Sequence, residues 1–129
     1  MKGSCLCGAV RIDVHGPFEH APEACHCAQC RKQTSHVFAG MNVRRAQLAI
    51  QGDENVTWYR SSENVQRGFC RLCGSALFWQ PAMPGCEYTS VAMGLFDPPT
   101  GTRLAKHTFV GEKSDYYEIA DGLPQREKF

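Results

Sequence analysis

Residues 69–75 have the sequence Phe-Cys-Arg-Leu-Cys-Gly-Ser, and this stretch decides what kind of fold we expect. Two residues between Cys70 and Cys73 let both sulfurs reach one metal ion, and the following glycine permits a tight turn. A closed structural zinc needs four ligands, so a second pair has to complete this knuckle. Cys5-Leu6-Cys7-Gly8 offers that pair. A metal shared by the two pairs would close a long loop and stabilise the fold; two unrelated reduced pairs are the alternative.

A second cluster, Cys25-His26-Cys27-Ala28-Gln29-Cys30, holds three cysteines within six positions. Three protein ligands with one open position are typical of a catalytic zinc, although His26 as a fourth ligand would close the site. Three thiolates make a soft, electron-rich centre that favours a further sulfur ligand, which predicts a thiol substrate. Cys86 stands alone and is expected to be a small buried residue, with a redox or ligand role as the alternative.

The composition is ordinary for a globular protein apart from the cysteines. The 129 residues fit one domain, and we expect it to span residues 1–124, with a polar tail over 125–129. The net charge of +1 gives little attraction to nucleic acid or membranes. The chain has eight cysteines, and its N-terminus shows no apolar leader, so we expect a reducing, cytoplasmic setting and metal binding in place of disulfides.

Short alternating segments rich in Val, Phe, Trp, Tyr and Thr predict a mainly β fold with little helix. Turn residues separate these segments, and one or two helical turns are expected at 28–34. The predicted strands are 8–14, 36–43, 55–60, 65–69, 75–80 and 87–93. A small sheet protein buries modest apolar area, so zinc would add needed stability.

Several charged or titratable residues lie near the second cluster in sequence. Arg31 and Lys32 follow it directly and could neutralise the thiolates or bind a substrate carboxylate, or they could be a solvated basic pair. His26 and His36 are candidate proton carriers because imidazole titrates near neutral pH; structural or surface roles are the alternative. His107 is a weaker candidate of the same kind.

The chain resembles the glutathione-dependent formaldehyde-activating enzyme family, which includes the domain of centromere protein V. The resemblance rests on three cysteine segments in this order and spacing, and it covers almost the whole chain. Those segments are residues 3–10, 25–32 and 67–75, with weaker matches at 94–97, at His107 and over the closing stretch from Tyr116 through Pro124.

This resemblance implies a β-rich fold of the family's type with two zinc ions, one structural and one catalytic. The implied structural ligands are Cys5, Cys7, Cys70 and Cys73, and the implied catalytic ligands are Cys25, Cys27 and Cys30. The implied reaction joins formaldehyde to the thiol of glutathione, giving S-hydroxymethylglutathione, and is classed with the carbon–sulfur lyases. The chain is shorter than the namesake enzymes, and it has Ser35 where many members have glycine.

We therefore expect a zinc-dependent carbon–sulfur lyase or synthase acting on a thiol–aldehyde adduct, with a thiol such as glutathione as its partner. His26, His36 and Arg31 are its expected catalytic residues. A binding module that uses a basic patch of Lys32, Arg44 and Arg45 is an alternative, and so is a thiol or zinc sensor. We expect no contact with membranes and no nucleic-acid partner. A homo-oligomer is one of the alternatives for the assembly state.

Overall fold

The computed structural model describes all 129 residues and confirms the expected mainly β architecture. All six predicted strands are present, and the one α-helix covers the predicted residues. This helix is too short to cross a membrane. The strands are β1 (Lys2–Ser4), β2 (Arg11–Val14), β3 (Glu23–Cys25), β4 (Phe38–Arg44), β5 (Leu48–Gln51), β6 (Val56–Ser62), β7 (Val65–Cys70), β8 (Ala76–Pro81), β9 (Tyr88–Ala92), β10 (Lys106–Thr108) and β11 (Gln125–Arg126), and the helix is α1 (Ala28–Thr34).

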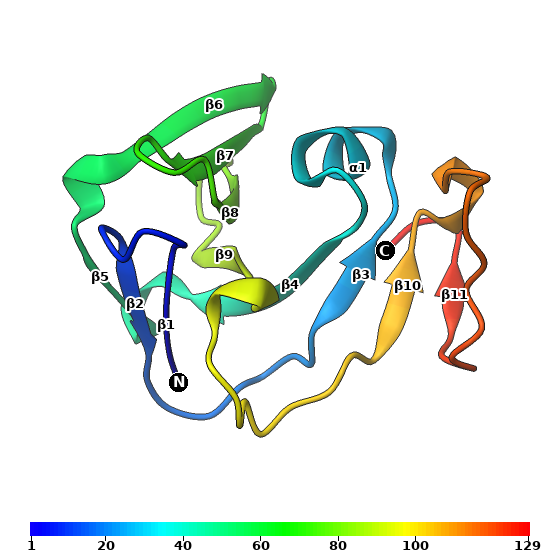
Figure 1. Cartoon of the computed structure of the whole chain (residues 1–129), viewed down its shortest axis with the longest axis horizontal. Helices are drawn as coiled ribbons and strands as arrows, with labels where there is room; N and C mark the ends of the chain where they lie inside the picture. Colours follow the sequence, from blue (N-terminus) through cyan, green and yellow to red (C-terminus); the bar gives the residue numbers. More distant parts are fainter.

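The strands form a small and a large sheet. The small sheet has the order β1-β2-β5, and the large one has the order β11-β10-β3-β4-β9-β8-β7-β6. Strands β3 to β9 of the large sheet pair antiparallel, whereas β10 pairs parallel with both β3 and β11. In Figure 1 the small sheet lies at one side of the molecule and β10 and β11 lie at the other. An isolated bridge between Gly3 and Phe96 links the small sheet to the segment after β9.

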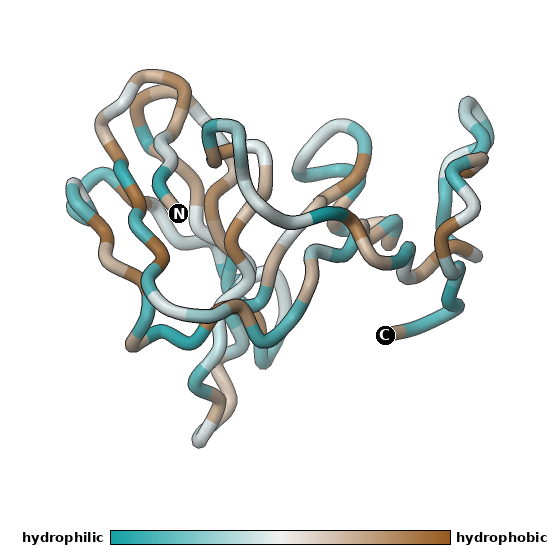
Figure 2. Tube along the Cα trace, turned by 90° about the horizontal axis from the view of Figure 1, so that it is seen from below, coloured by the Kyte–Doolittle hydropathy of each residue, from teal (hydrophilic) through white to brown (hydrophobic).

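The hydrophobic core lies between the small sheet and the middle of the large one. Buried residues alternate with less buried ones along β2 and in the second half of β4, as expected for strands with one buried face, whereas β8 and β9 hold consecutive buried residues and no exposed one. The tube in Figure 2 is dense around this core, and the C-terminal region extends to one side. The core cluster is Cys5, Val10, Ile12, Val14, Met41, Val43, Cys70, Leu77, Phe78, Val91, Leu95 and Phe96.

Helix α1 begins and ends in ways that matter for the site. At its start the sulfur of Cys27 accepts a hydrogen bond from the backbone N–H of Cys30 at 3.4 Å, so a cysteine takes the place of the usual Ser or Asp cap. At its end Ser35 has a φ of 65°, in the left-handed region that favours glycine. The helix therefore ends with a strained residue where the resemblance expects glycine.

Part of the C-terminal stretch 125–129 belongs to the large sheet. Gln125 and Arg126 form β11 beside β10, although the sequence marks residues 125–129 as a polar tail. The ring of Phe129 packs edge-on against Phe109, with centroids 4.9 Å apart. The structure thus places the chain end next to the strands that border the second cysteine cluster.

Candidate metal centres and cavity

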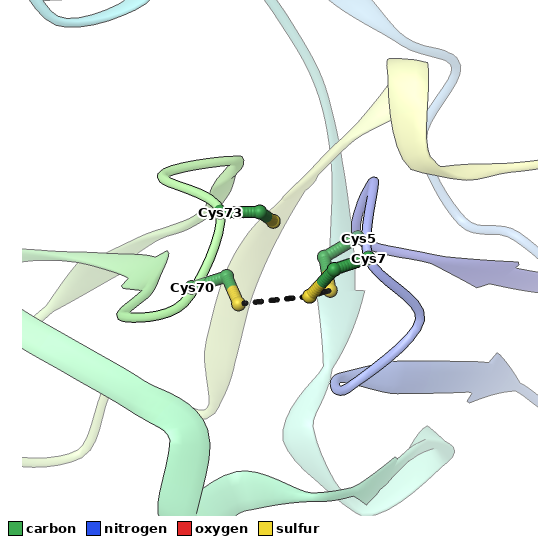
Figure 3. A group of neighbouring side chains, drawn as sticks. All are labelled: Cys5, Cys7, Cys70 and Cys73. Atoms are coloured by element: carbon green, nitrogen blue, oxygen red, sulfur yellow. Dashed lines mark hydrogen bonds between the residues drawn. The ribbon is translucent and has the colours of Figure 1, made fainter.

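The first centre is the tetrathiolate cluster, made of Cys5, Cys7, Cys70 and Cys73, whose sulfurs all lie within 4.8 Å of one another. Figure 3 shows the two pairs facing each other, one in the loop between β1 and β2 and the other at the end of β7 and in the turn that follows it. The Cys7 sulfur is 3.6 Å from that of Cys5 and 3.9 Å from that of Cys70. Zinc with bonds of 2.3 Å to four tetrahedral sulfurs would require separations of about 3.8 Å. The geometry therefore fits a four-sulfur metal site.

Ser75 connects the two loops of the tetrathiolate cluster. Its hydroxyl lies 3.2 Å from the Cys73 sulfur and accepts the backbone N–H of Leu6 at 3.0 Å. The hydrogen bond from Ser75 lowers the pKa of the Cys73 thiol to about 5. At neutral pH this cysteine is already the thiolate that a metal requires.

The second centre is the three-cysteine cluster, made of Cys25, Cys27 and Cys30. Cys25 ends β3, Cys27 caps α1 and Cys30 lies in its first turn, so the strand-to-helix junction brings the three sulfurs together. They also lie within 4.8 Å of one another, and no histidine or carboxylate atom joins the group. Such a set can hold a metal ion and leave a coordination position free.

Without a cation, the three sulfurs favour a single shared negative charge. Hydrogen bonds from Cys25 and then Cys30 lower the pKa of the Cys27 thiol to about 2. The pKa of Cys25 is raised, first by the hydrogen bond of Cys25 with Cys27, then by that with Cys30, and then by burial. Three thiolates can therefore coexist here only when positive charge is close to them.

Arg67 supplies positive charge to the three-cysteine cluster from β7, and the sequence did not single it out for this role. Its side chain is buried, with 4% exposure. Its guanidinium donates to the Cys30 sulfur at 3.6 Å, to Gln33 at 3.1 Å, to Gln29 at 3.2 Å and to Ser61 at 3.1 Å. All three of its nitrogens are thus engaged, and they orient α1 against the sheet.

A cavity of about 480 Å³ opens beside the three-cysteine cluster, and all three of these cysteines line it. Arg67, Phe38 and Trp79 contribute other parts of the lining, from strands β7, β4 and β8. This volume is within the range of small-molecule sites. A small ligand in the cavity would therefore contact the sulfurs directly.

His26 points away from the cavity into a buried chain of hydrogen bonds. Its Nε2 is 2.8 Å from Nδ1 of His107, and its Nδ1 bonds to the hydroxyl of Tyr117. Nε2 of His107 then donates to Asp121 at 2.8 Å. Burial first, and then the charge of His107, lower the pKa of His26. Because His26 lies between two of the cysteines, this chain of bonds holds their loop against β10 and the C-terminal segment.

The other predicted polar residues lie outside the cavity lining. His36 is exposed and bonds through Nδ1 to the hydroxyl of Tyr116 at 2.5 Å. Arg31 is half-buried with its Nε unpaired, and Lys32 is exposed. The charge that contacts the sulfurs thus comes from Arg67, in place of the Arg31 and Lys32 that sequence proximity suggested.

Two further residues behave independently of both clusters. Cys86 is half-buried in the turn between β8 and β9 and belongs to neither cluster. Arg44 of the expected basic patch pairs with Glu19 at 2.8 Å and with Glu87 at 3.2 Å. Its charge is therefore already balanced.

Comparison with known proteins gives a consistent assignment. Residues 1–112 match the family model described as glutathione-dependent formaldehyde-activating enzyme. A Halomonas elongata protein whose name provisionally assigns it that activity is 28% identical, over 92% of this chain and 80% of its own. An uncharacterised lyase of Schizosaccharomyces pombe is 32% identical, over 93% and 85%. The crystal structure of a Rhodobacter sphaeroides protein aligns with a TM-score of 0.62 and 27% identity, over 81% and 97%. The chain belongs to the glutathione-dependent formaldehyde-activating enzyme family.

Proposed function

We propose that the chain is a carbon–sulfur lyase or synthase that makes and breaks the bond between a thiol and an aldehyde. The observation that carries the proposal is the cavity of about 480 Å³ lined by the three sulfurs of the three-cysteine cluster. In the forward direction a carbon–sulfur bond forms, the carbonyl double bond becomes a single bond, and the thiol proton passes to its oxygen. The reaction needs no oxidant or reductant. Formation of S-hydroxymethylglutathione is the example that the family name suggests.

The two clusters fit two zinc ions, one structural and one catalytic. Bound at the three-cysteine cluster, zinc would supply a Lewis acid that stabilises a thiolate or an alkoxide at neutral pH. The tetrathiolate cluster would join the N-terminal loop to β7 and β8 and contribute to folding. The cysteines of both clusters would stay reduced, and so able to bind metal, in a reducing compartment such as the cytoplasm. This supports the expected cytoplasmic location.

The surrounding side chains hold the cluster in shape. Arg67 offsets the negative charge of the sulfurs and fixes Cys30, and the bonded chain through His26 fixes the loop between Cys25 and Cys27. Cys30 is buried and Cys25 and Cys27 are half-buried, which strengthens these charge interactions relative to those in water. Transfer of the thiol proton by His26 or His36 stays a prediction, since neither histidine lines the cavity. The expected role of Arg31, to neutralise the thiolates or to bind a substrate carboxylate, also stays a prediction.

A cysteine substitution with a matched control tests the proposal. Cys27→Ser should lose one of two zinc equivalents and at least about 100-fold in turnover of glutathione with formaldehyde and of simpler thiol–aldehyde adducts. Cys86 lies outside both clusters, so the Cys86→Ser variant should keep both metals and full turnover. Circular dichroism would establish that both variants fold. A folded Cys27→Ser protein with one zinc and parental turnover would refute the proposed function.

A further inference from the structure

The cavity beside the three-cysteine cluster offers almost no free positive charge to a substrate. Arg67 is the only lysine or arginine that lines it, and all its nitrogens already donate to protein atoms. Two carboxylates, those of Glu23 and Glu112, also line the cavity. Lys106 balances Glu23 at 3.0 Å, but Glu112 accepts only the backbone N–H of Ala28. The lining is therefore unfavourable for a ligand that carries carboxylates.

Aromatic and aliphatic side chains make up much of the remaining lining. Phe38, Trp79, Phe109 and Phe129 come from four separate segments, and Val65 adds a branched side chain. Phe109 and Phe129 meet edge-to-face at an interplanar angle of 88°. Flat apolar groups gain the most from such surroundings, through burial and through ring contacts.

We infer that the cavity selects a neutral thiol with an apolar, preferably aromatic, substituent over a carboxylate-bearing thiol such as glutathione. This inference rests on the proposed function and names the substrate class of the same site. Glutathione carries two carboxylates and one ammonium at neutral pH. Glu112 could receive the ammonium, but neither carboxylate would meet a free lysine or arginine, and three thiolates outweigh the two positive charges of a zinc ion bound to them. A benzylic thiol would bury its ring against the aromatic lining and leave no charge unpaired.

A size-matched pair of thiols isolates the effect of the carboxylate. 4-(Mercaptomethyl)benzamide and 4-(mercaptomethyl)benzoate have the same shape, and their charged or amide group lies far from the sulfur. Each adds to formaldehyde with formation of one carbon–sulfur bond and transfer of the thiol proton to oxygen. The catalysed rate is measured for both, and for glutathione, by exchange NMR with carbon-13 formaldehyde after subtraction of the uncatalysed rate.

We expect kcat/KM for the benzamide to exceed that for the benzoate, and that for glutathione, at least tenfold, a difference of about 1.4 kcal/mol. Equal values, or a preference for glutathione, would overturn the substrate class while leaving the proposed function intact. No acceleration with any of the three thiols would overturn both.

A substitution at Val65 tests the same inference from the protein side. Val65→Lys places a cation in the lining and should raise kcat/KM for the benzoate relative to the benzamide by tenfold or more. Val65→Met, a neutral change at the same half-buried position, should leave that ratio within twofold of the parent. An unchanged ratio in a folded Val65→Lys protein, with thiol exchange still catalysed, would contradict selection by charge.

Discussion

Replacing Arg67 with methionine removes the positive charge that contacts the three-cysteine cluster. Deleting one partner of a buried charged interaction costs about 3–5 kcal/mol. The lower end applies here, because Gln29 is exposed and Gln33 half-buried, so both amides regain water when the guanidinium is lost. Cys30 is buried and cannot do so. We therefore expect Arg67→Met to lower the free energy of unfolding by about 3 kcal/mol.

The same substitution should act selectively on one metal. The three-cysteine cluster should bind zinc about 10–100-fold more weakly, as expected when a group supporting a metal ligand is lost. The tetrathiolate cluster contains no atom bonded to Arg67 and should keep its affinity. Titration with a chromophoric chelator and urea unfolding would measure the two effects. Arg60→Met, at an exposed position on β6, is the control and should change neither. Parental affinity of both clusters in Arg67→Met would refute the role assigned to this arginine.

Three other changes test separate parts of the fold. Cys70→Ser should remove one zinc equivalent and lower the free energy of unfolding by about 3–5 kcal/mol, much as loss of a cross-link does, as measured by metal analysis and urea unfolding; full zinc content would exclude Cys70 as a ligand. Ser35→Gly should stabilise the protein by about 1 kcal/mol, because it relieves the positive φ at the end of α1; a lower thermal midpoint would contradict this. Hydrogen bonds from Arg44 first and Tyr88 second lower the pKa of Glu19. Since the folded pKa is below the unfolded one, this stabilisation is present above about pH 4.5 and is lost as the pH falls through the folded pKa. The difference in urea midpoint between the parent and Glu19→Gln should therefore be larger at pH 7 than at pH 3.5, and a constant difference would argue against the ion pair.

Local patterns in the sequence were sufficient for the longer elements. Strands β4 and β7 are six or seven residues long and contain aromatic and β-branched residues, and β4 alternates apolar and polar residues over its last four positions, which is enough for a strand to be recognised. The strands β1, β3 and β10 were not predicted, because three residues are too few to show a strand period. These strands form through pairing with neighbours that are distant in sequence.

The sequence by itself determined the two cysteine groups and their division into four and three, because metal ligands a few residues apart are recognisable from spacing alone. Only the tertiary structure decided what surrounds them. Arg67 reaches Cys30 across 37 residues, and His26 meets His107 across 81. The cavity lining likewise comes from separate segments. Such contacts depend on the order and register of the strands in the sheet, which bring side chains together irrespective of their distance along the chain.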